Sequence, residues 1–329
     1  MTAAGRGLRG GALPRVEGAG ALPGVVTDGA VSAAELQIYE PPRFFESFLR
    51  GRAHTEVSDL TSRICGICPV AYQTSAWNAI EQVCGVDAGP RITALRRLLY
   101  CGEWVSSHAL HIYLLHAPDF LGLPDGIALA HDHRDLLERG LRLKKAGNAI
   151  LERVGGRAIH PVNPRLGGFY RAPTGAELAE LAEQLRPALD DALATVAWVA
   201  GFDFPDRELD EELLALHHPD RYAIESGDVR SSGGLAFTAS EFDDHVVEHQ
   251  VAHSTALHAA LDGRRYLTGP LARYSLNAAQ LSPLARQAAA AAGLGLTCRN
   301  PFRSIVVRAV ETVYAVEEAL RIIAAYERP

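Results

Sequence analysis

The chain has 329 residues, of which 48% are hydrophobic and 22% are charged, and its net charge is −7. These values are typical of a globular protein with a large core, and the negative charge argues against nucleic acid as the main partner. The five cysteines have irregular spacings, which fits a reducing, cytoplasmic location better than a disulfide framework. We expect no cleavable signal and no membrane span, because no apolar run approaches the required length of about 20 residues.

The N-terminal part predicts a tail followed by a small sheet. Residues 1–12 are small, glycine-rich and basic, so we expect a disordered tail. Residues 14–40 alternate with strand spacing, which predicts a short N-terminal sheet. Within this stretch Glu17 precedes Gly18, and a glycine permits close backbone approach. The alternative is a surface glutamate at the end of a strand.

A helix is predicted over residues 43–52, because its phenylalanines recur on one face and Glu46 lies on the other. The apolar spacing predicts further helices, including a long buried one over residues 91–116. These lengths predict a mainly α fold, a bundle of long helices with a small N-terminal β-sheet. The remaining predicted helices cover residues 70–83, 135–154, 174–200, 283–292 and 303–326.

The segment of residues 63–70 combines two thiols, a cation and a glycine. Cys65 and Cys68 have a spacing at which two thiolates can bind one metal, and Gly66 lets the backbone fold between them. Arg63 provides a cation that favours thiolates. We expect both sulfurs to be buried near the centre of the bundle. A zinc knuckle, a thiol redox centre and an inert core pair remain open alternatives at this spacing.

Two histidine patterns are candidates for other chemistry. His108 and His111 are three residues apart and can share one face of a helix, although such histidines are more often satisfied core or interface groups. Residues 245–249 match the H-x-x-E-H pattern of inverted zinc peptidases. Because further histidines follow at His253 and His258, a structural polar stripe on a helix is the favoured interpretation.

Three segments, residues 15–18, 44–52 and 63–72, together resemble the large (alpha) subunit of nickel-iron hydrogenases in order and spacing. Residues 107–111, 167–170, 248–254 and 300–305 resemble the cytoplasmic, NAD(P)-linked branch of that family. The similarity runs from about residue 15 to the last residue. The resemblance therefore implies one large-subunit-like domain over residues 13–329.

The resemblance also implies a cofactor and roles for individual residues. The cofactor is a nickel-iron centre with diatomic ligands on the iron. Cys65 is expected to be a terminal nickel ligand and Cys68 a bridge between nickel and iron. Glu17 is expected to be the first proton carrier, Glu46 a ligand of a structural magnesium-like ion, and Arg63 a cation that holds the loop electrostatically.

The implied activity is the reversible oxidation of dihydrogen, with electrons passed through a small iron-sulfur subunit to flavin- and NAD(P)-binding diaphorase subunits. The family's second cysteine pair, in a C-terminal D-P-C-x-x-C motif, is absent, and Cys298 is single. We therefore expect a C-terminally incomplete hydrogenase domain that is inactive by itself, since nickel in this setting takes four sulfur ligands. Two alternatives are a non-catalytic hydrogenase-like or complex I-like scaffold, and a zinc or thiol-redox protein that uses Cys65 and Cys68 alone.

Overall fold

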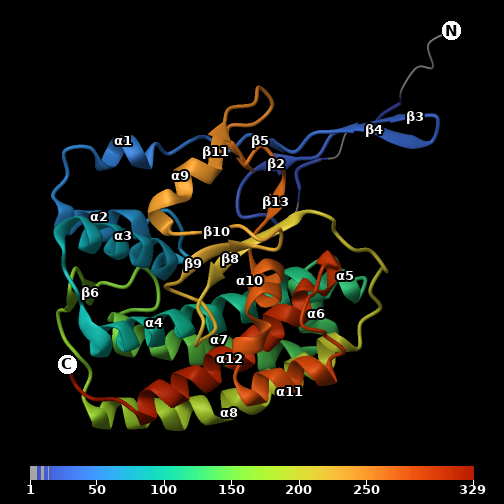
Figure 1. Cartoon of the computed structure of the whole chain (residues 1–329). Coiled ribbons are helices and arrows are strands. Elements are labelled where there is room, and N and C mark those ends of the chain that lie inside the picture. The colour runs from blue at the N-terminus through green and yellow to red at the C-terminus, as the bar shows by residue number, and fades with distance from the viewer. Residues whose placement is uncertain (1–5, 9–10, 14) are drawn as a thin grey trace. The chain divides into compact units, whose positions relative to one another are not determined.

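The computed structural model describes residues 6–8, 11–13 and 15–329, and helices dominate it (Figure 1). These residues form two compact units. The first comprises the chain up to Phe44 together with residues 239–266, and the second comprises residues 45–238 and 267–329. Most of the predicted tail, residues 1–12, falls outside the described residues. The described part of this segment includes strand β1 (Arg6–Leu8). The predicted domain over residues 13–329 includes parts of both units.

The first unit is built mainly from strands. Strand β3 (Gly24–Thr27) lies between β1 and β4 (Ala30–Ala34), and both neighbours are antiparallel to it. The two-residue turn between β3 and β4 consists of Asp28 and Gly29, with φ of 52° and 79°, as a tight hairpin turn requires. A second pair joins β2 (Gly20–Ala21) to β5 (Gln37–Ile38). The predicted small N-terminal sheet is confirmed.

The histidine-rich segment of the first unit is a hairpin, so the predicted polar stripe on a helix is wrong. The helical part ends at His245, where α9 (Phe242–His245) gives way to β11 (Val246–His249). Strand β11 pairs with β12 (His258–Leu261), and His249 lies opposite His258. The physical reason is that two consecutive valines at the start of β11 favour a pleated strand over a helix. The strand also removes the helical geometry that an H-x-x-E-H peptidase site needs.

The second unit is organised by four long helices that lie side by side in Figure 1, namely α4 (Gly89–Leu110), α7 (Arg134–Gly155), α8 (Gly175–Ala200) and α12 (Ser304–Ala324). Helix α4 packs on α7 and α12, and α8 packs on α12 and α7. Glycines allow α4 and α7 to approach closely: a Cβ on Gly147 would lie 2.5 Å from the backbone nitrogen of Ser106. The predicted bundle of long helices is confirmed.

The shorter elements differ from the prediction at two places. The helix expected over residues 43–52 is only α1 (Phe45–Leu49), because Phe44 and Gly51 have positive φ at either side of it. The helix expected over residues 91–116 is α-helical to Leu110 and continues as a π-helix, η1 (His111–His116). The other elements of the second unit are α2 (His54–Ser62), α3 (Pro69–Cys84), α5 (Ala117–Phe120), α6 (Gly126–Asp132), β6 (Pro164–Arg165), β7 (Gly168–Phe169), β8 (Glu212–His217), β9 (Asp228–Ser231), β10 (Ala236–Phe237), α10 (Pro270–Asn277), η3 (Ala278–Gln280), α11 (Pro283–Ala291) and η4 (Pro301–Arg303).

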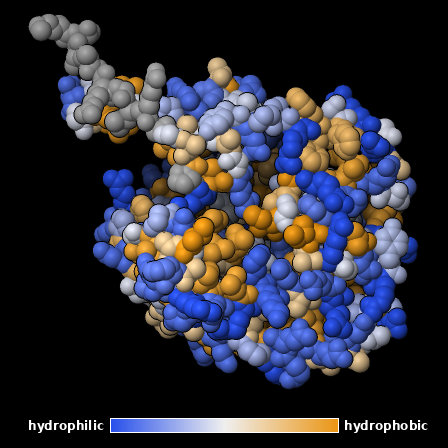
Figure 2. All heavy atoms as spheres, turned by 180° about the vertical axis from the view of Figure 1, so that it is seen from behind, coloured by the Kyte–Doolittle hydropathy of each residue, from blue (hydrophilic) through white to orange (hydrophobic). Residues whose placement is uncertain are grey.

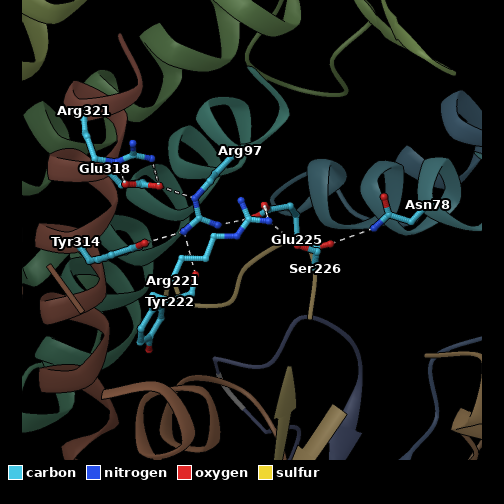
Figure 3. A network of polar contacts seen from close by, with 9 residues as sticks. All are labelled: Asn78, Arg97, Arg221, Tyr222, Glu225, Ser226, Tyr314, Glu318 and Arg321. Carbon is cyan, nitrogen blue, oxygen red and sulfur yellow. Dashed lines mark hydrogen bonds and ion pairs between the residues drawn. The ribbon is translucent and has the colours of Figure 1, made fainter. Parts of the chain in front are cut away.

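A buried polar network connects three of these helices (Figure 3). Its centre is Arg97 of α4, whose side chain is 2% exposed and forms ion pairs with Glu225 at 2.6 Å and Glu318 of α12 at 2.5 Å. Tyr314 of α12 lies 2.6 Å from the same guanidinium. The backbone carbonyl of Glu225 accepts a hydrogen bond from Asn78 of α3 at 3.0 Å. The network therefore holds α3, α4 and α12 in a common frame.

Candidate metal centre

The two cysteines of the C-x-x-C motif lie on the loop that connects α2 to α3. Helix α2 ends with Arg63 as its C-cap, and α3 begins at Pro69 with Cys68 as its N-cap. Cys65 and Cys68 are half-buried, so the expectation that both are fully buried is wrong. The loop is partly open because it bends between two helices and leaves Ile67 at 37% exposure.

The geometry of this loop fits thiolate ligands. The Sγ atom of Cys65 accepts hydrogen bonds from the backbone N–H groups of Ile67 at 3.3 Å and Cys68 at 3.1 Å. Donors directed at a sulfur stabilise its anionic form, and the N-terminal end of a helix favours negative charge. Soft thiolate donors select soft or redox metals such as nickel and iron. These residues therefore fit one half of a nickel-iron site.

Arg63 contacts an acidic partner on its own helix. Its guanidinium lies 3.3 Å from the carboxylate of Asp59, one turn earlier, and both side chains are about half exposed. This pair places a cation next to the cysteine loop. The predicted role of Arg63 in holding that loop stays a prediction.

The first turn of α3 is supported by a glutamate that the sequence analysis missed. The carboxylate of Glu103 accepts hydrogen bonds from the backbone N–H groups of Val70 at 2.6 Å and Ala71 at 3.1 Å. Glu103 belongs to α4 and is 3% exposed. Burial raises the pKa of Glu103 to about 8, although the two amides act in the opposite direction. A lone acidic residue in the apolar stretch of residues 101–106 was the available signal.

The two other glutamates predicted for the site are exposed. Glu17 belongs to the first unit and the cysteines to the second, so its approach to the thiols stays a prediction. Next to it, Gly18 has a φ of 157°, a backbone conformation that favours glycine. Glu46 lies on α1, and no group of three potential metal ligands in the described part of the chain includes it. Its role as a magnesium ligand is also untested.

His108 is a satisfied core group, as the favoured interpretation expected. Its Nε2 lies 2.9 Å from the carboxylate of Glu311, which is 0% exposed. Arg273 donates two hydrogen bonds to the same carboxylate at 2.7 and 2.8 Å, and the hydroxyl of Tyr222 donates another at 2.7 Å. Burial acts to raise the pKa of Glu311, but Arg273 and His108 lower it to about 2. His111 instead packs against His116, with ring centroids 4.3 Å apart.

The fold and the loop together define a class of protein: a helix bundle with a pair of half-buried cysteines at a helix N-terminus, an arrangement that suits soft metal ions. Within the described part of the chain, no helix is long and apolar enough to cross a membrane.

Comparison with known proteins defines the family. Residues 43–163 match the family model described as nickel-dependent hydrogenase. Sulfhydrogenase 1 subunit alpha of Pyrococcus furiosus is 33% identical over 310 residues, which cover 94% of this chain and 72% of that protein. Sulfhydrogenase 2 subunit alpha of the same organism is 34% identical over 309 residues, covering 94% and 73%. The chain belongs to the nickel-dependent hydrogenase family.

The solved structures agree with this assignment. An NAD+-reducing NiFe-hydrogenase in the H2-reduced state superposes with a TM-score of 0.86 at 25% identity, over 98% of this chain and 78% of that chain. The resemblance to a nickel-iron hydrogenase large subunit and the predicted fold are confirmed. The chain is a large subunit of the catalytic type, an oxidoreductase of the hydrogenase class.

Proposed function

We propose that Cys65 and Cys68 hold the nickel-iron centre, with Cys65 as a terminal nickel ligand and Cys68 as a bridge to iron. When bound, such a centre supplies metal-assisted splitting of dihydrogen into protons and electrons. The observation that carries the proposal is the pair of backbone N–H donors at 3.3 and 3.1 Å from the sulfur of Cys65. The chain contributes thiolates that are already oriented before a metal arrives.

Glu17 is proposed as the first group to accept the proton released at the centre. A carboxylate can take and release a proton, and transfer requires a hydrogen bond or one bridging water. The φ of 157° at the adjacent Gly18 is a conformation that favours glycine and supports a defined backbone path next to Glu17. Glu46 is proposed to bind a magnesium-like ion through its carboxylate, and Arg63 to keep the cysteine loop in a cationic environment.

The proposed partners are a small iron-sulfur subunit and flavin- and NAD(P)-binding diaphorase subunits. The relatives from Pyrococcus furiosus are named alpha subunits, and the structural relative is NAD+-reducing. The surface supports protein partners, because hydrophobic side chains gather in patches on the face seen in Figure 2 and large apolar residues such as Val83 and Tyr170 are exposed. The proposed location is the cytoplasm.

The metal ligands that this chain supplies are two thiolates out of the four that the family resemblance implies. Cys84 lies at the opposite end of α3, roughly 24 Å from the loop at 1.5 Å per helical residue. Cys101 and Cys298 are buried, and no metal-binding group of three in the described residues includes any of these cysteines. We therefore propose that residues 1–329 by themselves do not turn over dihydrogen and that a second cysteine pair from outside these residues completes the ligand set.

The test measures nickel and iron content and hydrogen-dependent dye reduction. The purified chain is compared with and without a separately supplied C-terminal segment of the Pyrococcus furiosus relative. We expect metal and activity only with the segment, loss of both in Cys65→Ser and Cys68→Ser, and loss of activity with metal retained in Glu17→Gln. Stoichiometric nickel and robust activity in the chain alone would contradict the proposal. Absence of metal under every condition would favour the scaffold function.

A further inference from the structure

The start of α3 lacks the side-chain cap that a helix normally has. Cys68 occupies the N-cap position without a capping hydrogen bond from its side chain, and Pro69 occupies the first helical position. Proline has no N–H group, so the first unsatisfied donors of this helix belong to Val70 and Ala71. A serine or aspartate at residue 68 would satisfy such donors. The side chain of Cys68 does not provide this cap.

Glu103 supplies the missing cap from another helix. Its two carboxylate oxygens each accept one of the two amides, at 2.6 and 3.1 Å. Its own position is fixed by packing, because the preceding Gly102 lies against α7, where a Cβ would come within 2.8 Å of Ile150. The carboxylate is therefore held by the bundle and presented to the first turn of α3.

We propose that Glu103 is a positioning residue for the metal site, which sets the direction of the first turn of α3 and thereby the orientation of both thiolates. The N–H group of Cys68 donates to the sulfur of Cys65, so a tilt of this turn displaces both ligands together. The inference rests on the proposed role of the cysteine pair as metal ligands. Substitution of residues that orient metal ligands typically lowers metal affinity by about 10- to 100-fold.

Two substitutions test the acceptor oxygens of Glu103 and the length of its side chain separately. Glu103→Gln keeps one acceptor oxygen within reach and replaces the other by an NH2 group that cannot accept from an amide. Glu103→Asp keeps a carboxyl group but is one methylene shorter, so it cannot span both amides. A control for general destabilisation is Tyr113→Phe, which removes a buried hydrogen bond of 2.6 Å to Thr195 without contacting α3.

The experiment uses the full 329-residue chain with Cys84→Ser, because Cys84 is exposed and would compete for metal. Cobalt(II) is the probe, and thiolate-to-cobalt absorption reports binding at the cysteine pair. Hydrogen exchange at the amides of Val70 and Ala71 is measured on the metal-free chain. We expect Glu103→Gln and Glu103→Asp to speed that exchange and weaken cobalt binding by about tenfold each, with Tyr113→Phe unchanged in both.

The outcomes distinguish this inference from the proposed function. Unchanged exchange at Val70 and Ala71 in both Glu103 variants would overturn the positioning role, as would equal effects in Tyr113→Phe. Unchanged cobalt affinity with faster exchange would also overturn it, since the cap would then not reach the thiolates. If the unsubstituted chain shows no thiolate absorption with cobalt, the ligand role of the cysteines fails, and the exchange measurement still decides whether Glu103 holds α3.

Discussion

Glu103 of α4 and Glu311 of α12 both carry buried carboxyl groups, yet their surroundings shift the pKa of these groups in opposite directions. At the junction of α3 and α4, Glu103 receives hydrogen bonds from two backbone amides, and burial raises its pKa to about 8. Between α4, α10 and α12, Glu311 receives hydrogen bonds from Arg273, His108 and Tyr222, and its pKa falls to about 2. Burial disfavours the ionised form of both carboxyl groups. Only Glu311 has a cationic partner, and this partner keeps it ionised.

The largest expected effect follows from removing the charge of the α12 carboxylate. Glu311→Gln leaves Arg273, whose side chain is 21% exposed, without its ionic partner, and breaking a buried pair typically costs about 3–5 kcal/mol. The free energy of unfolding is measured by urea denaturation. Tyr222→Phe, which removes only one hydrogen bond to the same carboxylate, is the control and should cost about 1 kcal/mol. Equal losses in the two variants would show that the ion pair contributes nothing beyond a hydrogen bond.

The same substitution should change the response to acid. The pKa of Glu311 is lowered from 4.5 to about 2 in the fold, so its contribution is complete above pH 4.5 and is lost as the pH falls towards 2. The slope is about 1.4 kcal/mol per pH unit. His108, whose pKa is also lowered, acts in the same direction but begins below its ordinary value of 6.5. The difference in slope between the parent and Glu311→Gln should therefore be largest below pH 4.5, with a smaller part between pH 4.5 and 6.5, because Glu311 also acts on the pKa of His108.

At the α3–α4 junction, the dependence of stability on pH should have the opposite sign. The pKa of Glu103 is raised from 4.5 to about 8, so the folded state binds its proton more tightly than the unfolded state. Stability is therefore lost as the pH rises from 4.5 towards 8, by about 1.4 kcal/mol per unit at most. In unfolding measured across this range, Glu103→Gln should remove that decline. A decline of the same size in the variant would assign it to other groups.

The smallest effect is expected at an exposed carboxylate beside the cysteine loop. Asp59→Asn breaks the ion pair with Arg63, in which both side chains are about half exposed. Such pairs contribute about 0–1 kcal/mol and weaken in salt. Urea denaturation at low and high salt should show a loss below about 1 kcal/mol that disappears at high salt. A loss comparable to that of Glu311→Gln would mean that burial is not the property that separates these carboxylates.

The sequence predicted those features that local patterns determine. Apolar residues at helical spacing identified α7 and α8 closely, because each of these helices buries one continuous face. The cysteine loop was recognised because Cys65, Gly66 and Cys68 are adjacent in sequence. In both cases, the residues that determine the structure lie close together in the sequence.

The rest depended on contacts between distant segments. The role of Glu103 is invisible in the sequence because its partners are backbone amides of another helix. Strand β11 was mistaken for a helix because histidines at mixed spacings fit either structure, and its pairing with β12 is decided by segments about ten residues apart. Glu311 was not selected because a glutamate in a largely apolar helix does not reveal that Arg273 faces it.

The cap on α3 also has a consequence for the order of folding. Glu103 and Val70 are 33 positions apart in sequence, whereas His108 and Glu311 are 203 apart. Closing the longer loop costs about 1.6 kcal/mol more in chain entropy, so α3 and α4 can pair before α12 docks. We expect pulse-labelled exchange during refolding to protect the amide of Val70 before those of α12, and the reverse order would exclude this sequence of events. The thiolate loop would then be in place early, ready to receive metal while the C-terminal helix is still free.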